Sequence, residues 1–256
     1  MDLGLGGRVA LVTGGSKGIG LAVARQLAEE GAELVLVSRT ESELAAAAES
    51  IAARTGRVPR FATADVGDDA SVAALAEQVG PVQILVNAAA TPNAGGFPES
   101  DLADHVNVKV VGALRTARAF APGMVAAGWG RIINISGLGA RQAGSVVGSV
   151  RNVAVVAMTK NLADELGPHG VNVTVVHPGT TVTERTPAMV ARLAEQRYGG
   201  DTAAAEQALA RGVSIGRLVT AAEVADVVAF LASPRSVAIN GDVVAAGGGA
   251  RGAIRY

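Results

Sequence analysis

The chain of 256 residues carries 22 basic and 23 acidic side chains, so its formal net charge is −1. This length fits one α/β domain with a large core. Because there is no basic excess to neutralise phosphates, nucleic acid is not an expected partner. No apolar run reaches the ~18 residues that span a bilayer, and the first residues lack a signal-peptide pattern. We therefore expect a cytoplasmic protein without a membrane partner.

Metal and thiol chemistry are also not expected. The chain has no cysteine, which excludes disulfides, a thiol nucleophile and thiolate metal ligands. The three histidines, His105, His169 and His177, do not have the spacing of metal ligands.

A glycine-rich turn follows the first predicted strand. Arg8–Thr13 is a short apolar run, typical of a buried parallel strand, and helical spacing of apolar residues begins at Leu21. A strand, a glycine turn and a helix in this order let a pyrophosphate approach main-chain N–H groups at the positive end of the helix. The stretch predicts a dinucleotide site, with a tight turn that binds nothing as the alternative. Its glycines are Gly14, Gly15, Gly18 and Gly20.

The spacing Thr13-Gly14-x-x-x-Gly18-x-Gly20 resembles the short-chain dehydrogenase/reductase family. The resemblance runs from Gly7 to about Gly249 and implies a single α/β domain over residues 1–256. The implied fold is a Rossmann-type, doubly wound sheet of about seven mostly parallel strands flanked by helices. It also implies a homo-oligomer, either a dimer or a tetramer, and a substrate lid over residues 180–216.

The end of the second predicted strand, Glu33–Ser38, indicates which dinucleotide is bound. NAD-specific sites usually carry an acidic residue here, which bonds the ribose 2′-hydroxyl. This chain has Arg39 instead, a planar and permanently charged donor that suits a 2′-phosphate. Lys17, inside the glycine turn, would lie beside the same phosphate. Each could be a solvated surface charge, but their convergence on one group favours NADP(H) over NAD(H).

The resemblance places further cofactor contacts after the later strands. Asp65 stands where the family contacts adenine, unless it only caps the next helix. Residues 87–90 read Asn-Ala-Ala-Ala where the family has Asn-Asn-Ala-Gly, so the Cβ of Ala90 could crowd the cofactor. The segment from Pro178 to Thr183 matches the family's nicotinamide-binding loop. The predicted cofactor-binding residues are Gly14, Ser16, Lys17, Gly18, Ile19, Gly20, Ser38, Arg39, Asp65, Val66, Asn87, Ala88, Ala89, Pro178, Gly179, Thr181 and Thr183.

The family's reaction needs a tyrosine that transfers a proton, and a lysine one helical turn later that lowers the pKa of this tyrosine. Residues 158–167 and 171–179 match the family without gaps, and counting back puts Gly148 at the tyrosine position and Asn152 at the lysine position. Glycine has no proton to transfer, and an amide carries no charge that could shift a pKa. The resemblance therefore implies an atypical active site that lacks the Tyr-x-x-x-Lys pair.

Two catalytic candidates remain, Ser136 and Asn107. The family's catalytic serine is the second of two hydroxyl residues, which here read Ser136-Gly137, so Ser136 could serve only with a different rotamer or loop. Asn107 matches an asparagine that opens a helical kink and anchors a proton-relay water; a polar residue bonded to nearby backbone is the alternative. Arg151 could hold a phosphate, a ribose or a substrate oxyanion, although it points about 100° away from Asn152 on an ideal helix.

The chain's two tyrosines, Tyr198 in the lid and Tyr256 at the end, are displaced proton donors or ordinary surface or interface residues. Three hypotheses for function follow. The first is an atypical NADP(H)-dependent reductase or dehydrogenase that acts on a small-molecule carbonyl or alcohol. The second is a non-redox enzyme on the same scaffold. The third is a non-catalytic nucleotide-binding or regulatory protein.

Overall fold

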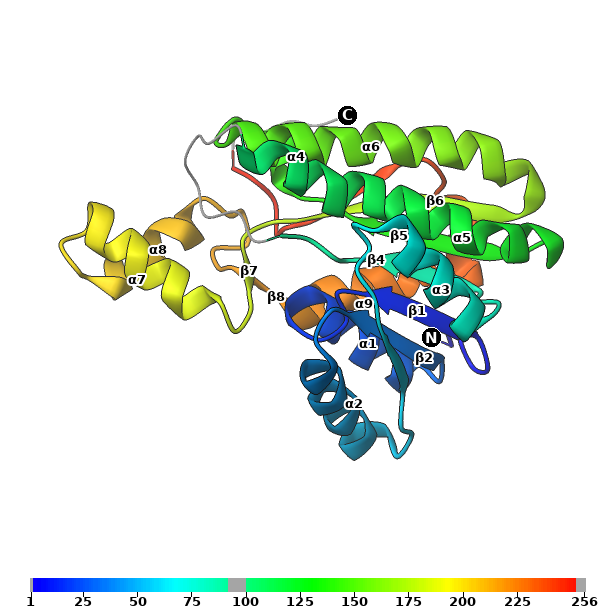
Figure 1. The fold of residues 1–256 in the computed structure, drawn as a ribbon. Helices are drawn as coiled ribbons and strands as arrows, with labels where there is room; N and C mark the ends of the chain where they lie inside the picture. Colours follow the sequence, from blue (N-terminus) through cyan, green and yellow to red (C-terminus); the bar gives the residue numbers. More distant parts are fainter. Residues whose placement is uncertain (1, 92–99, 252–256) are drawn as a thin grey trace.

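The computed structural model describes residues 2–91 and 100–251, and this part of the chain folds around one parallel sheet (Figure 1). The strands of this sheet are β1 (Val9–Thr13), β2 (Glu33–Ser38), β3 (Arg60–Thr63), β4 (Ile84–Asn87), β5 (Gly130–Ile135), β6 (Val171–Pro178) and β9 (Val243–Ala246). They hydrogen-bond in the order β3-β2-β1-β4-β5-β6-β9, and every neighbouring pair is parallel. The predicted doubly wound sheet of seven strands is confirmed.

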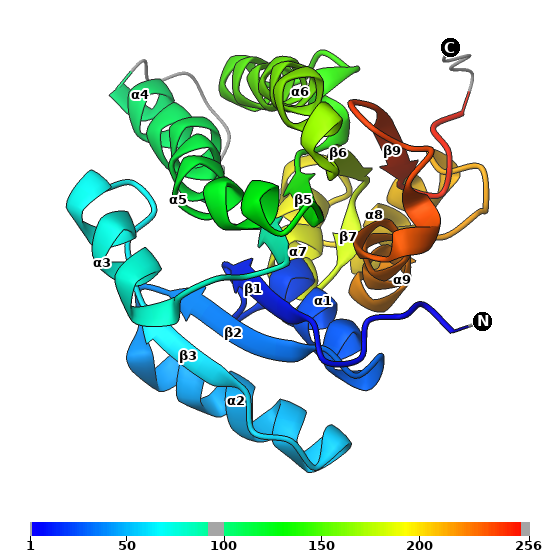
Figure 2. The ribbon, with the colours of Figure 1, turned by 90° about the vertical axis from the view of Figure 1, so that its right-hand side faces the viewer.

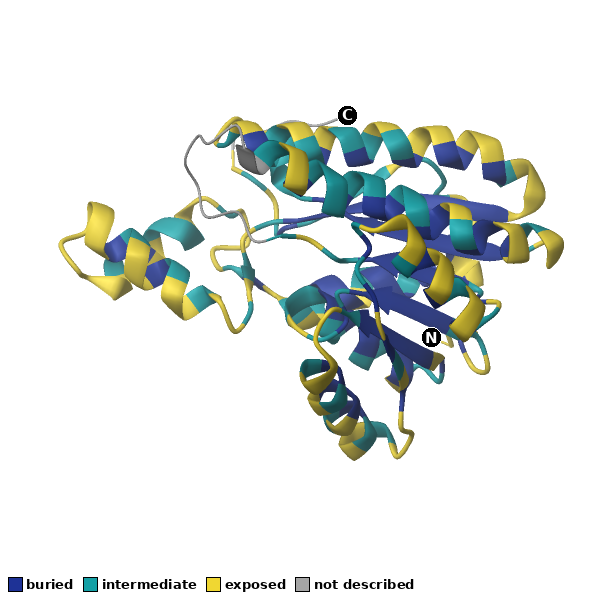
Figure 3. Cartoon of the chain, in the orientation of Figure 1, coloured by how far each residue is buried: buried dark blue, intermediate teal, exposed yellow. Residues whose placement is uncertain are grey.

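Helices cover both faces of the sheet (Figure 2). Successive side chains of a strand point to opposite faces, so Ala10 and Val12 of β1 pack in one core and Leu11 packs in the other. The inner strands are therefore mostly buried (Figure 3), as parallel sheets require, whereas the edge strands β3 and β9 are partly exposed. The first core is completed by α1 (Gly18–Glu29), α2 (Glu41–Thr55) and α9 (Ala221–Ala232), and the second by α3 (Asp69–Val79), α5 (Gly112–Ala126) and α6 (Val146–Leu166).

Local signals set several helix ends. Gly56 ends α2 in the left-handed conformation, with φ of 70°. At the start of α9, the Thr220 side chain accepts from the Glu223 backbone, and Glu223 accepts from the Thr220 backbone. This capping box satisfies two N–H groups that the helix itself cannot pair.

The helical stretch before β5 is interrupted. Residues Ser100–Val106 form α4, Asn107–Val111 form a π-helical turn, and α5 follows directly. A π-helical turn inserts one extra residue into an α-helix and changes which side chains face a neighbouring element. The turn begins at Asn107, where the family resemblance predicted a kink.

The predicted lid region forms two helices, α7 (Thr186–Arg197) and α8 (Thr202–Arg211), which extend away from the main sheet (Figure 1). They share a small apolar core of Val190, Ala194 and Ala205. A short parallel ladder of β7 (Thr181–Val182) with β8 (Val219–Thr220) connects this unit to the body.

Within the described residues, no helix is both long enough and apolar enough to cross a membrane. Tyr256 and most of the loop before α4 lie outside the described residues.

Candidate functional site

A cleft of about 490 Å³ opens at the carboxyl ends of the strands. The chain passes outward from β1 to β2 and β3, and then returns to β4 on the other side of β1. In doubly wound sheets, ligands bind in the crevice at such a switch point. The volume lies in the range of small-molecule and cofactor sites.

The glycine turn forms one wall of this cleft because the backbones approach closely there. Gly14 has φ of 67°, and a Cβ on it would lie 2.9 Å from the backbone of Ala88. A Cβ on Gly20 would lie 2.2 Å from the carbonyl oxygen of Gly14. Thr13 stabilises the contact between the glycine turn and the segment after β4, because its hydroxyl accepts from the N–H groups of Ala88 and Ala89 at 3.2 and 3.3 Å. These contacts leave room for glycine alone at positions 14 and 20.

The first turn of α1 begins at this wall with N–H groups that no side chain caps. Lys17 is the N-cap residue, and within the described chain it makes no side-chain cap bond. Uncapped N–H groups at the positive end of a helix are a site for phosphate oxygens. The turn therefore fits the pyrophosphate of a dinucleotide, with Gly18, Ile19 and Gly20 presenting the backbone.

Basic residues and one carboxylate gather at the far end of the cleft. Lys17 Nζ lies 2.7 Å from Glu43 Oε1, and the Ser16 hydroxyl donates to Glu43 at 3.4 Å. The hydrogen bond from Lys17 holds the pKa of the Glu43 carboxyl below its ordinary value. Arg39 is exposed and lines the cleft beside them. The sequence interpretation missed Glu43, which lies in the first turn of α2.

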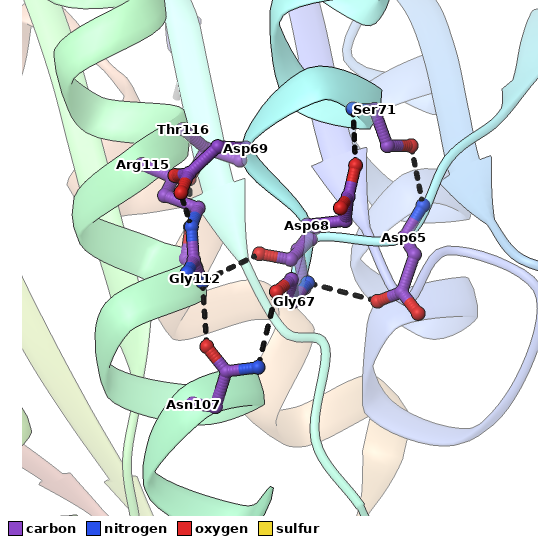
Figure 4. Close-up of polar contacts among 10 residues, drawn as sticks. Asp65, Gly67, Asp68, Asp69, Ser71, Asn107, Gly112, Arg115 and Thr116 are labelled. Atoms are coloured by element: carbon purple, nitrogen blue, oxygen red, sulfur yellow. Dashed lines mark hydrogen bonds and ion pairs between the residues drawn. The ribbon is translucent and has the colours of Figure 1, made fainter.

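Asp65 and Val66 line the cleft after β3, and Figure 4 shows the bonds around them. Asp65 Oδ1 accepts from the Gly67 N–H at 2.8 Å. The cap of α3 is Asp68, whose carboxylate accepts from the Ser71 N–H at 2.7 Å. Asp65 is thus not the cap of α3, and its carboxylate shapes the loop at the edge of the cleft.

Asn107 is bonded to protein groups and lies outside the residues that line the cleft (Figure 4). Its Nδ2 donates to the Gly67 carbonyl at 3.0 Å, and its Oδ1 accepts from Arg115 at 2.8 Å. Arg115 also pairs with Asp69 of α3. In this structure Asn107 connects the π-helical turn to the loop after β3, as the structural alternative predicted. Its role in proton transfer stays a prediction.

Asn87 belongs to a buried network behind the cleft. It donates to Asn134 at 3.0 Å and accepts from Thr116 at 2.7 Å. Asn134 in turn donates to Thr159 at 3.0 Å. The network joins β4 and β5 to α5 and α6, and it fixes the strand ends that support the site.

The structure brings most of the predicted cofactor residues to one place. Those that line the first cleft are Gly14, Ser16, Lys17, Gly18, Ile19, Gly20, Ser38, Arg39, Asp65, Val66, Ala88, Ala89, Pro178 and Thr183. A second cleft of about 480 Å³ adjoins it and is lined by Gly179 and Thr181. Ser136, Pro178 and Thr183 line both clefts, so the two spaces share a wall.

Ser136 and Asn152 line the second cleft, whereas Gly148 is not among its described lining residues. Ser136 is buried, and its hydroxyl donates to the Asn152 carbonyl at 3.1 Å. Gly148 lies in the first turn of α6, where its N–H donates to the Ser145 cap. The Asn152 amide is packed against two glycines, since a Cβ on either Gly137 or Gly139 would lie 3.1 Å from its Nδ2. A side chain at either glycine would therefore require the amide to shift by a few tenths of an ångström.

Lys109 is a site residue that the sequence interpretation missed. It is 8% exposed, lies on the π-helical turn and lines both clefts. Its Nζ donates to the Ser136 carbonyl at 3.0 Å. Burial, and secondarily the charge of Arg151, lowers the pKa of the Lys109 ammonium to about 7. The signal available in the sequence was its place two residues after Asn107.

The structure gives Tyr198 no place in the described lining of the two clefts, and it shows no metal-ligand cluster among the described residues. Tyr198 ends α7 and is absent from the described lining of both spaces. Among the described residues, no group of three or more histidine or acidic side chains could hold a metal ion.

The pKa of Lys109 makes stability depend on pH. Its folded pKa of about 7 lies below the usual 10.5, so the unfolded chain binds more protons between these values and stability rises with pH across that window. Lys109→Met should therefore stabilise the protein more at about pH 6 than at about pH 9, by a difference of about 2.7 kcal/mol. Urea unfolding at both pH values measures it. The exposed Lys160→Met is the control, and an equal effect of Lys109→Met at both pH values would contradict the assignment.

Comparison with known proteins gives a consistent result over nearly the whole chain. Residues 8–194 match the family model described as short chain dehydrogenase. The short-chain reductase protein NovJ of Streptomyces niveus is 37% identical over 94% of this chain and 93% of its own. The 3-oxoacyl-[acyl-carrier-protein] reductase FabG of Vibrio cholerae is 33% identical over 96% of this chain and 98% of its own.

A solved structure is similar over the full length. The L-sorbose reductase of Gluconobacter frateurii, in complex with NADPH and L-sorbose, superposes with a TM-score of 0.92. It is 31% identical, and the match covers 99% of this chain and 100% of that one. The fold, the glycine turn and the matched length all indicate the same family. This chain belongs to the short-chain dehydrogenase family.

Proposed function

We infer that the chain is an atypical NADP(H)-dependent reductase or dehydrogenase that acts on a small-molecule carbonyl or alcohol. The observation that carries this is the continuity of the two clefts. The first has the glycine turn of a dinucleotide site, and the second opens from it at Ser136 and Lys109. A cofactor in the first cleft would present its reactive end to a substrate in the second.

Two observations support NADP(H) over NAD(H). Ser38, Arg39 and Lys17 surround the end of β2, where a 2′-phosphate would lie, and Arg39 has a permanent positive charge. The sorbose reductase of similar fold binds NADPH. Glu43 is an argument against NADP(H), because its carboxylate lies 2.7 Å from Lys17 Nζ. Lys17 would have to leave this ion pair to bind a 2′-phosphate.

The chain's own residues would bind and orient the reactants. The turn around Gly14 and the first N–H groups of α1 hold the pyrophosphate, and the bound cofactor supplies or accepts the hydride. Ser136 and the loop after β6 form the wall next to the reacting carbon. With Gly148 at the tyrosine position, the proton must come from water or from a displaced side chain, so turnover should be slow.

A non-catalytic nucleotide-binding protein is the second candidate. Gly148 removes the proton donor, and Asn152 removes the neighbouring charge. Such a protein would bind the dinucleotide without transferring hydride.

Nucleotide selectivity tests the cofactor assignment. NADPH at ~100 times its dissociation constant should stabilise the protein by about 2.7 kcal/mol, which raises the melting temperature by several degrees. Arg39→Gln should weaken NADPH about tenfold and leave NADH unchanged, because only NADPH carries the 2′-phosphate. Glu43→Gln should tighten NADPH by freeing Lys17. Equal responses to NADPH and NADH in all three proteins would contradict the assignment.

Turnover separates the two candidates. With NADPH and a panel of carbonyl compounds, the wild type should show slow oxidation of the cofactor, whereas a non-catalytic protein should show none. The double variant Gly148→Tyr/Asn152→Lys is the informative comparison, because it restores a phenol and its charged neighbour. If activity appears only in the double variant, the non-catalytic reading replaces the first.

Self-association is a further part of the proposal. Val146, Val150 and Val153 recur along α6 and are 51%, 43% and 50% exposed. This spacing places them on one face of the helix, which suits an interface between copies of the chain. Light scattering should give a dimer or tetramer mass that Val150→Glu lowers, and a monomeric wild type would contradict it.

A further inference from the structure

The second cleft contains positive charge without a matching carboxylate. Lys109, Arg151 and Arg185 are among its described lining residues, and no aspartate or glutamate is. Arg185 is at the exposed rim, where it lies 3.8 Å from Glu184. Lys109 and Arg151 are the inner pair, and neither has an ion-pair partner in the described part of the chain.

Lys109 retains unused donors within this cleft. An ammonium group has three N–H donors, and the structure gives one bond, to the Ser136 carbonyl at 3.0 Å. The side chain is buried against α6, so its charge is poorly screened by water. Its lowered pKa reflects both this burial and the nearby charge of Arg151.

Arg151 adds a second cation from the first turns of α6. Its Nη1 lies 2.9 Å from the Thr91 carbonyl and 2.6 Å from His105 Nδ1. A guanidinium can only donate, so Nδ1 of His105 accepts. Neither contact supplies negative charge. The Nε of Arg151 is buried and lacks a described hydrogen-bond partner.

Asn152 provides an independent sign of a ligand in the same cleft. The residue is 6% exposed, and its Oδ1 is buried without a hydrogen-bond partner among the described residues. A buried acceptor left unpaired costs free energy comparable to a lost hydrogen bond. A hydroxyl group in the cleft would satisfy it. The cleft thus offers two cations and one acceptor.

We propose that the second cleft binds the anionic group of a substrate between Lys109 and Arg151, so that the substrates are carbonyl acids and the corresponding hydroxy acids. The carboxylate offsets the repulsion between two buried cations. The hydroxyl of the hydroxy acid donates to Asn152 Oδ1. In the reductive direction NADPH would supply the hydride that adds to the carbonyl carbon and would leave as NADP⁺. A proton from solvent adds to the carbonyl oxygen, while the carboxylate is unchanged.

This inference rests on the proposed function only where it calls the anion a substrate. An anion between Lys109 and Arg151 could also be a cofactor phosphate, because the two clefts share a wall. Binding measured with NADP⁺ already bound distinguishes the two sources. A substrate anion binds beside NADP⁺, whereas a cofactor phosphate competes with it.

The experiment is a fluorine NMR titration in saturating NADP⁺ with para-fluorobenzoylformate and its neutral methyl ester. The carboxylate should bind at least tenfold more tightly than the ester. Its affinity should be constant below about pH 7 and fall roughly tenfold per pH unit above, because only the protonated Lys109 attracts it. Glu184 and Arg185 are the other charged side chains at the rim of the cleft.

Variants make the assignment specific. Lys109→Met should remove the pH dependence, and Arg151→Met should weaken the carboxylate at least tenfold without changing the ester. Arg118→Met, on the exposed face of α5, is the matched control and should change neither. The wild-type pH profile remains informative if a variant fails to fold.

Other results overturn the inference. Equal binding of acid and ester, or pH-independent binding that Lys109→Met leaves unchanged, contradicts the anion site. Competition between the carboxylate and NADP⁺ assigns the cations to the cofactor and overturns the substrate assignment. If NADP⁺ itself does not bind while the carboxylate does, the proposed function fails and the anion site remains.

Discussion

The close backbone packing at Gly14 and Gly20 is the constraint on which the site depends. A Cβ at either position would overlap the end of β4 or the turn itself, so the chain can bring β1, α1 and β4 together only through glycine. Thr13 holds the same corner by accepting from two successive N–H groups of the Ala88–Ala89 segment. The result places the positive end of α1 at the switch point of the sheet, and the cleft follows from that placement.

The surroundings of Asn152 and the charges of the second cleft belong to one part of the structure. The Asn152 amide lies close to Gly137 and Gly139, where a Cβ would be 3.1 Å from its Nδ2. Lys109 from the π-helical turn and Arg151 from α6 add positive charge to the same cleft. This cationic wall suits the binding of an anion, which is the substrate group that we propose for it.

Much of the fold could be predicted from the sequence, because β-branched runs, glycine turns and capping residues act locally. The bounds of β2 are as predicted, and the glycine turn lies where the motif placed it. The direction of individual side chains could not be predicted from the sequence. Asn107 and Asn87 match family positions but bond inside the protein, whereas Lys109 turns into the cleft because Asn107–Val111 is a π-helical turn. Arg151, expected to point away from Asn152, lines the same cleft.

The most direct test of the account is a single-turnover experiment with NADPH that carries deuterium at the transferable position. Excess protein is mixed with this NADPH and a panel of α-keto and β-keto acids, and mass spectrometry detects deuterium in the hydroxy acid product. The account predicts deuterium on the former carbonyl carbon, transferred slowly and reduced in Lys109→Met. Binding of both NADPH and the acid without any transfer of deuterium would contradict it and leave a nucleotide-binding protein without redox activity.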